Sequence, residues 1–563
     1  MPGFPGDSLN CVWALDFFWS TLVAGESPFE TRQVFYPIGA NLMHAGGAPT
    51  IALAAAPFWF WDGAQGIVTF FGVLAIAVIV VGGLGMRACV QALTGNAVAA
   101  LWGGLFYAGA PALLTFVSSP FYFRTAGGVM LPWGLAALVR YLETPRRARY
   151  LAGVSAVTWA LLFTDYYMLF SFLVIVVMIG LVNVRRELVV PTLTGLAANG
   201  VLATTVILSL PPLETADFSI GGSMWSLSAA NLADLFVPGP LPQQSSVQYF
   251  RGVLAPLSSY ATDWGPNPSS YFIGYGILVL IVIALVRRFD RRTLGLLVAA
   301  VMLVLLACGT LVKWTRDGAV LVQYPWSPFH WVVMVPWLQA FDNPRCFMLG
   351  AATPIIALAG VGLASLRLRT RSVGLIGLGV FLLDYAQAGM PVNTPTIPRV
   401  YEQLAALPKA TLFELPSGID ESKGGLGLNF DRTDNNEAMY WQAFHHQPRV
   451  AGYMSRVPKA TFEWFFHEPV IGDLLLLTTN NSQWTCYHQE TRKVEQLPTY
   501  PPEVVDEFVR KLDLGYLIFR PGTKQEYFMA EVERLLGSRI ASREMIDGYG
   551  FMTVERSASA QAD

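Results

Sequence analysis

Charge is scarce in this chain, because Asp, Glu, Lys and Arg make up only 13% of its 563 residues. A soluble protein has about 25%. Hydrophobic residues account for 53%, and the mean hydropathy is +0.45. The formal net charge of -2 excludes a nucleic-acid-binding protein, which needs a strongly basic surface. The sequence therefore indicates an integral membrane protein.

Cysteine is also rare, and the five cysteines stand apart from one another. Cys89 and Cys308 lie in or beside apolar runs, whereas the other three are isolated in the sequence. This pattern predicts neither a disulfide framework nor a zinc site. The sequence has no P-loop, dinucleotide fingerprint, His-Glu-x-x-His or Gly-x-Ser-x-Gly motif. Any chemistry must therefore depend on individual acids and arginines.

Ten apolar stretches are candidate membrane-spanning helices, since a span needs roughly 20 residues. They are 67–86, 96–116, 127–143, 150–164, 166–184, 190–211, 269–286, 293–312, 345–365 and 372–389. If they alternate in direction, the arginine-rich breaks after the first, third, fifth, seventh and ninth spans all lie on one side. The positive-inside rule makes this side cytoplasmic. The loops 1–66, 212–268 and 313–344 are then outside, together with the C-terminal segment.

The two ends of the chain are predicted to be extracytoplasmic. Residues 8–24 are apolar but too short and polar to span, so a helix lying on the membrane is expected. Segment 1–66 contains neither a signal peptide nor a clear span, so we expect an upstream first helix. Residues 390–563 have a soluble composition and predict an α/β or α+β domain, with strands at 412–415 and 514–519 and helices at 502–512 and 524–537. The prediction has three parts: an outer segment 1–66, a transmembrane domain 67–389 and a soluble domain 390–563.

Two acids are candidates for catalysis. Asp7 opens the first outer segment, where a carboxylate can act as a general base toward a hydroxyl. Its alternative role is an N-cap of the helix that follows, which the local sequence favours. Asp165 lies at an outer turn between two spans, and an acid at that depth is costly and often functional. The alternative for Asp165 is a solvated turn residue.

Two arginines at the outer side are candidates for binding phosphate, because the planar guanidinium donates two parallel hydrogen bonds. Arg345 begins the ninth span and Arg124 lies on the same side. The alternatives are a salt bridge, with Asp342 for Arg345, or simple extension toward water. His445 and His446 are adjacent, and on a strand they would point to opposite faces, so a shared metal ion is not expected.

Five short motifs follow one another along nearly the whole chain. They are Gly6-Asp7-Ser8 with Trp13, Phe35-Tyr36-Pro37-Ile38-Gly39 with Pro49, Asn343-Pro344-Arg345-Cys346-Phe347, Leu412-Phe413-Glu414-Leu415-Pro416, and the run from His446 to Arg456. In this series the chain resembles the C superfamily (GT-C) of polytopic glycosyltransferases. More narrowly, it is similar to YfhO-like membrane proteins of bacteria and archaea. It departs from the superfamily in lacking a helix before Asp7 and in having no second acid beside Asp7, with Asp16 about two helical turns on.

The resemblance implies a glycosyltransferase of a bacterial or archaeal inner membrane. It would move a sugar from a polyprenyl-phosphate donor to an extracytoplasmic glycan, lipid or protein, and a single base with direct displacement would invert the anomeric centre. The implied site comprises Asp7 as the base, Arg345 and Arg124 at the donor phosphate, Asp165 or Asp16 as a further acid, and His446 and Arg456 on the acceptor side. No cofactor is predicted with certainty, although a divalent cation could assist the phosphate. The alternatives are a transporter or flippase of a lipid-linked saccharide and a non-catalytic membrane scaffold.

Overall fold

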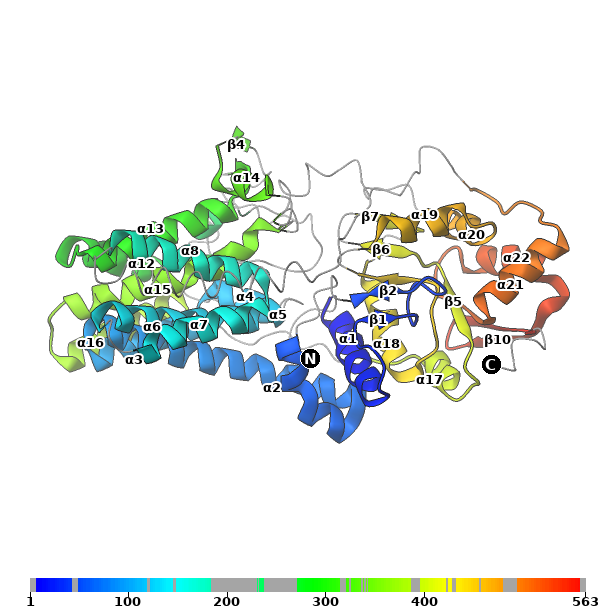
Figure 1. The fold of residues 1–563 in the computed structure, drawn as a ribbon, viewed down its shortest axis with the longest axis horizontal. Helices are drawn as coiled ribbons and strands as arrows, with labels where there is room; N and C mark the ends of the chain where they lie inside the picture. The colour runs from blue at the N-terminus through cyan, green and yellow to red at the C-terminus, as the bar shows by residue number, and fades with distance from the viewer. Residues whose placement is uncertain are drawn as a thin grey trace.

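The computed structural model consists of a bundle of long helices and a unit of short helices and small sheets, on the left and right of Figure 1. It describes residues 7–42, 49–118, 122–144, 148–183, 230, 232–236, 271–313, 320–323, 326–335, 338, 341, 343–385, 395–421, 424–427, 432–454, 457–478 and 494–556. The first helix, α1 (Asp7–Val23), lies with the right-hand unit although it begins the chain (Figure 1). Helix α1 and the C-terminal segment therefore belong to one part of the structure.

The bundle is built around the central helix α15. The helices of the bundle are α2 (Pro49–Thr94), α3 (Ala97–Ala108), α4 (Pro111–Ser118), α5 (Tyr122–Gly128), α6 (Leu131–Glu143), α7 (Ala148–Leu162), α8 (Tyr166–Val182), α12 (Tyr275–Arg287), α13 (Arg291–Ala307), α15 (Phe347–Ser365) and α16 (Thr370–Asp384). Every residue of α15 from Phe347 to Leu363 is buried, and this helix packs against α2, α3, α8, α12 and α13. A Cβ on Gly362 would lie 1.9 Å from the carbonyl oxygen of Leu280, so the glycine allows α15 and α12 to approach closely.

Two helical stretches are long and apolar enough to cross a membrane, Pro49–Thr94 and Pro344–Ser365, and a third is possible if Ala97–Ala108 and Pro111–Val117, bent by 42°, form one span. The other described apolar helices are shorter, and the predicted sixth span, 190–211, lies outside the described residues. The apolar helices agree with the predicted membrane location, but the predicted count of ten spans is not confirmed. The first predicted span forms the second half of α2, which is broken by non-helical backbone at Asp62 and Gly63.

The loop before α15, which is predicted to lie outside, contains a hairpin and a short helix. Strands β3 (Leu311–Lys313) and β4 (Val320–Gln323) pair antiparallel, and α14 (Pro328–Val333) follows them. The 3₁₀ turn η5 (Pro344–Cys346) then leads into α15. A second 3₁₀ turn, η2 (Leu232–Leu235), lies in the loop 212–268.

The C-terminal unit contains a four-stranded sheet in the order β10 (Ile540–Ile546), β11 (Tyr549–Val554), β9 (Leu514–Phe519) and β5 (Thr411–Leu415). β5 and β9 run parallel, while β9, β11 and β10 are antiparallel neighbours. A smaller sheet has the order β7 (Gly424–Leu426), β6 (Ile419–Glu421) and β8 (Gly452–Tyr453). The helices are α17 (Arg399–Ala405), α18 (Arg432–His445), α19 (Lys459–His467), α20 (Ile471–Leu477), α21 (Pro502–Leu512) and α22 (Gln525–Leu536). The predicted strands and helices at 412–415, 514–519, 502–512 and 524–537 are confirmed to within a residue or two.

The described N-terminal segment, residues 7–42, is part of this unit. The backbone N–H of Arg449 donates to Gln33 O at 2.8 Å, and Tyr36 N–H donates to Arg449 O at 3.0 Å, so residues 33–36 extend the edge beside β5. The short strands β1 (Glu30–Thr31) and β2 (Ala40–Asn41) pair on either side of this contact. Helix α1 packs along α18, and both helices contribute to one hydrophobic core. The predicted soluble domain therefore does not stand apart from the N-terminal segment.

The prediction that residues 8–24 form a helix is confirmed, and its expected position on the membrane stays a prediction. Its apolar residues Val12, Trp13 and Phe17 are buried in the fold, where α1 packs against α18 and α2. Large exposed apolar side chains lie instead on the first half of α2, at Phe60 and Trp61.

Candidate functional site

Two of the predicted residues form an ion pair where the bundle faces the C-terminal unit. Arg124 on α5 lies 3.7 Å from the carboxylate of Asp165, measured from Nε to Oδ2, and both side chains are largely buried. The guanidinium also lies over the Tyr167 ring, 4.7 Å from its centre. Asp165 caps α8, because its Oδ1 accepts the Met168 N–H at 2.9 Å. The alternative of a solvated turn residue was wrong for Asp165, since the residue is only 8% exposed.

Arg345 joins the same cluster through two hydrogen bonds. Its Nε donates to Asn343 Oδ1 at 3.0 Å, and the Asn343 backbone N–H donates to the Tyr167 hydroxyl at 2.7 Å. Tyr167 therefore contacts Arg124 through its ring and is linked to Arg345 through its hydroxyl. Within the described residues Arg345 forms no ion pair, whereas Arg124 is already paired with Asp165. Asp342, the alternative partner of Arg345, lies outside the described residues.

A cavity of about 60 Å³ lies between α1, α2, α5 and the C-terminal unit. Its walls include Asn10 and Trp13 of α1, Phe123 of α5, and Tyr453 and Met454 beside β8. Phe123 precedes Arg124 in the chain, and α1 begins at Asp7. The cavity thus joins the helix that carries Asp7, the helix that carries Arg124 and the motif that runs from His446 to Arg456.

The structure brings together Asp16 and His446, which are predicted for different roles. Asp16 is buried in α1, and its Oδ1 accepts the Trp59 indole N–H at 2.9 Å. His446 Nδ1 lies 4.0 Å from Asp16 Oδ2. Burial raises the pKa of Asp16, while Trp59 and the charge of His446 act in the opposite direction. The pair links α1 to the end of α18, which is a structural use of both residues.

A strand was considered for the two histidines, but neither lies on one. His445 ends α18, and His446 follows with a left-handed backbone, at φ 54°. His445 is buried, and its Nδ1 accepts the Gln447 N–H at 3.0 Å. Burial lowers the pKa of His445 to about 3, with opposing influence from Glu414, so the imidazole is neutral at ordinary pH.

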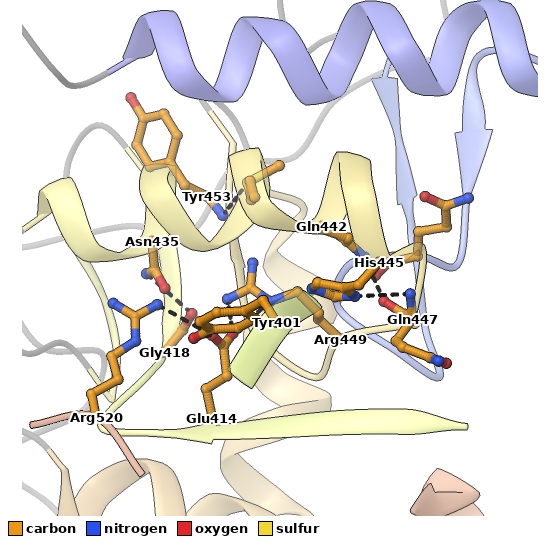
Figure 2. Close-up of polar contacts among 12 residues, drawn as sticks. Tyr401, Glu414, Gly418, Asn435, Gln442, His445, Gln447, Arg449, Tyr453 and Arg520 are labelled. Carbon is orange, nitrogen blue, oxygen red and sulfur yellow. Dashed lines mark hydrogen bonds and ion pairs between the residues drawn. The ribbon is translucent and has the colours of Figure 1, made fainter. Parts of the chain in front are cut away.

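A buried polar network connects Arg449, in the motif that runs from His446 to Arg456, with Glu414 (Figure 2). This network was not predicted from the sequence. Arg449 Nε donates to Glu414 Oε2 at 2.6 Å, and its Nη2 pairs with the same oxygen. The other carboxylate oxygen accepts the Tyr401 hydroxyl at 2.6 Å and lies 3.3 Å from Arg520 Nη2. Burial alone would raise the pKa of Glu414, but Arg449 and Arg520 outweigh it, and the pKa falls to about 2. An acid in the middle of the apolar run 412–415 was the signal that could have revealed this network.

Several predicted residues cannot be placed in a site. The structure places the backbone of Asp7 at the start of α1 but does not describe its side chain, and Arg456 lies outside the described residues. Among the residues that the structure does describe, no group of three or more His, Cys, Asp or Glu side chains could hold a metal ion. These residues therefore offer no ligand set for a divalent cation.

Comparison with known proteins gives likenesses of fold. No protein-family model matches the chain, and no curated protein matches its sequence. The Archaeoglobus fulgidus oligosaccharyltransferase in complex with zinc and sulfate is similar with a TM-score of 0.48 and 10% identity, over 92% of this chain and 64% of that one. The mycobacterial arabinofuranosyltransferase AftD gives 0.45 and 12%, over 99% of this chain and 41% of that one. ArnT from Cupriavidus metallidurans gives 0.40 and 11%, over 98% and 94%.

The similar structures include an oligosaccharyltransferase and an arabinofuranosyltransferase. This chain spans less than two thirds of the length of either. TM-scores of 0.48 and below are too low to assign an activity, so the residues themselves must support one.

Proposed function

We propose that this protein transfers a sugar from a polyprenyl-phosphate donor to an acceptor hydroxyl on the extracytoplasmic side of the membrane. The main support is the link between Arg124 and Arg345 through Tyr167 and Asn343, at the end of the bundle that faces the C-terminal unit. Two arginines from segments more than 200 residues apart are thus linked to the same tyrosine. Such a cluster suits the phosphate of a lipid-linked donor, because arginine binds phosphate oxygens in pairs.

Arg345 is the better placed of the two for the donor phosphate. Arg124 already has a carboxylate partner, so a phosphate would compete with Asp165 for it. Arg345 has only an amide oxygen as its described partner and is half-buried. In the proposed arrangement, Arg345 binds the phosphate directly and Arg124 keeps Tyr167 and Asp165 in position behind it.

The transfer would proceed by direct displacement. The acceptor oxygen forms a bond to the anomeric carbon while the bond from that carbon to the phosphate oxygen breaks. The acceptor proton passes to a carboxylate, for which we propose Asp7, and the electron pair of the broken bond leaves with the polyprenyl phosphate. Arg345 stabilises the charge that develops on this leaving group, which gives it a larger effect on the rate than on donor binding.

The experiment is sugar transfer in membranes that contain the full chain, with a panel of labelled polyprenyl-phosphate sugars. Removal of one charge-stabilising group typically lowers a rate by about 10²–10³-fold, so Arg345→Ala should have an effect of this size, and Asp7→Asn at least as large. Arg543→Ala, an exposed arginine on β10, is the matched control and should retain full activity. Equal transfer by Arg345→Ala and the parent protein would contradict the assignment of the phosphate site. Transfer from no donor, with the chain folded, would instead favour transport or a scaffold.

A further inference from the structure

The outer loop between α13 and α15 presents an apolar surface on and around the short helix α14. Trp326, Trp331, Met334 and Val335 are 72%, 57%, 60% and 42% exposed. Figure 1 shows α14 and β4 above the bundle, near the end closest to the C-terminal unit. Soluble surfaces rarely expose several large apolar side chains together, so a patch of this kind marks a contact with another apolar phase.

Buried anchors on the opposite side hold the patch in place. Phe329 and Val333 are 0% and 4% exposed. Ser327 donates its hydroxyl to the carbonyl oxygen of Gly309, at the end of α13, and accepts the Phe329 N–H at 3.1 Å. These contacts cap the N-terminus of α14 and anchor its buried side, which leaves Trp331 and Met334 on the exposed side.

We propose that this patch lies in the interface of the outer leaflet, with Trp331 and Met334 in contact with lipid. The segment 326–335 contains no Asp, Glu, Lys or Arg, so it carries no charge that would oppose contact with lipid. It follows the β3–β4 hairpin, which comes after α13 in the predicted eighth span. Tryptophan prefers the headgroup level of a bilayer, where one end of the indole is apolar and the other can reach water.

The depth of the patch follows from its backbone. The β3–β4 hairpin is a two-stranded ribbon with open edges, which do not occur where backbone is exposed to hydrocarbon. His330, on the same helix, is only half-buried and also needs a polar environment. The surface is therefore interfacial and does not enter the hydrocarbon core.

This contact would fix the height of the arginine cluster relative to the lipid phosphates. The Phe329 ring packs edge-on against Phe347 with 6.4 Å between centres, and Phe347 packs against Tyr167 at 5.5 Å. Tyr167 lies under Arg124. A short aromatic path thus joins the lipid-facing helix to the guanidinium groups. The inference concerns membrane contact and holds whether or not the protein transfers a sugar.

The test is photocrosslinking of the full chain in bilayer nanodiscs. The photoreactive residue p-benzoylphenylalanine replaces Trp331 or, as a second site, Met334, and adducts are identified by mass spectrometry. We expect phospholipid adducts at both positions. The control position is Tyr527 on α22, which is 38% exposed on the C-terminal unit and should give no lipid adduct.

Three results would overturn the inference. One is crosslinking of position 331 and position 334 to another part of this chain or to a second copy. Another is the absence of any adduct at both positions while the protein remains folded, which would place the patch in water. The last is an equal yield of lipid adducts at position 527, because labelling would then not depend on position.

Discussion

The buried ion pair between Arg449 and Glu414 should be essential for the stability of the C-terminal unit. In Arg449→Met the carboxylate stays buried but loses the partner that contacts it through Nε and Nη2. Arg520, at 3.3 Å, and the Tyr401 hydroxyl remain. Loss of one partner from a buried pair costs about 3–5 kcal/mol, because a poorly compensated charge is left in the interior.

The assay is hydrogen exchange of the β5 amides, Thr411–Leu415, in the full chain in mild detergent. At 1.36 kcal/mol per factor of ten, the expected loss of protection is about 10²- to 10⁴-fold. The backbone hydrogen bonds from Arg449 to Gln33 and from Tyr36 to Arg449 can form in the variant, so exchange of Tyr36 reports whether the N-terminal segment is released along with the strand.

The matched control is Arg543→Met, on β10 of the same sheet. Arg543 pairs with Glu533, but its side chain is 54% exposed. An exposed pair contributes about 0–1 kcal/mol, so protection of β5 should change by less than about tenfold. An equally small change in Arg449→Met would refute the reasoning, because it would mean that the buried pair gives no more stability than a surface one.

Trp59→Phe removes the indole N–H that donates to Asp16 and should weaken the docking of α1 by about 1–3 kcal/mol. Amide exchange in α1 should then be faster, whereas Trp61→Phe, at a 70% exposed position, should leave this exchange unchanged. Gly362→Ala should lower the melting temperature, since its Cβ would meet backbone of α12, and Gly374→Ala, with nothing within 4 Å, should leave it unchanged or raise it. His445 stays neutral when folded, so as the pH falls from 6.5 toward 3 the unfolded chain binds a proton that the folded chain does not, and stability should fall by up to about 4 kcal/mol. His445→Gln should flatten this pH dependence in denaturant titrations, and an unchanged slope would show that other groups cause it.

Local patterns in the sequence predicted the elements of the C-terminal unit well. A short apolar run indicates a buried strand, and an amphipathic stretch indicates a helix. Each pattern forms the expected element, the strands at 412–415 and 514–519 and the helices at 502–512 and 524–537. The helix at 8–24 was likewise predicted, but the partner of its apolar side was not. The apolar composition of this helix indicates that Val12 and Phe17 avoid water, but it contains no information on whether lipid or α18 covers them.

For the candidate residues, too, the sequence predicted single residues but not the contacts between them. Charge in an apolar setting identified Arg124, Asp165 and Arg345 one at a time, and the link between them depends on Tyr167 and Asn343, which look like ordinary turn residues in the sequence. The contact of Asp16 with His446 could not be predicted, because their distance in space depends on how the whole intervening bundle folds. The count of ten spans stays unconfirmed, and the bend between α3 and α4 interrupts the predicted second span, 96–116, although the sequence there remains apolar.

The edge contact between Gln33 and the region of Gln442 and Arg449 has a consequence for biosynthesis. Gln442 donates to Gln33 O across 409 residues of sequence. At about 5–20 residues per second, a ribosome needs roughly 20–80 s to produce the second partner after the first. During that interval α1 exists without α18, and its buried side chains Val12, Trp13 and Phe17 have no partner from this domain. The newly made N-terminal segment would therefore need a chaperone or the membrane surface to cover it until α18 has been synthesised.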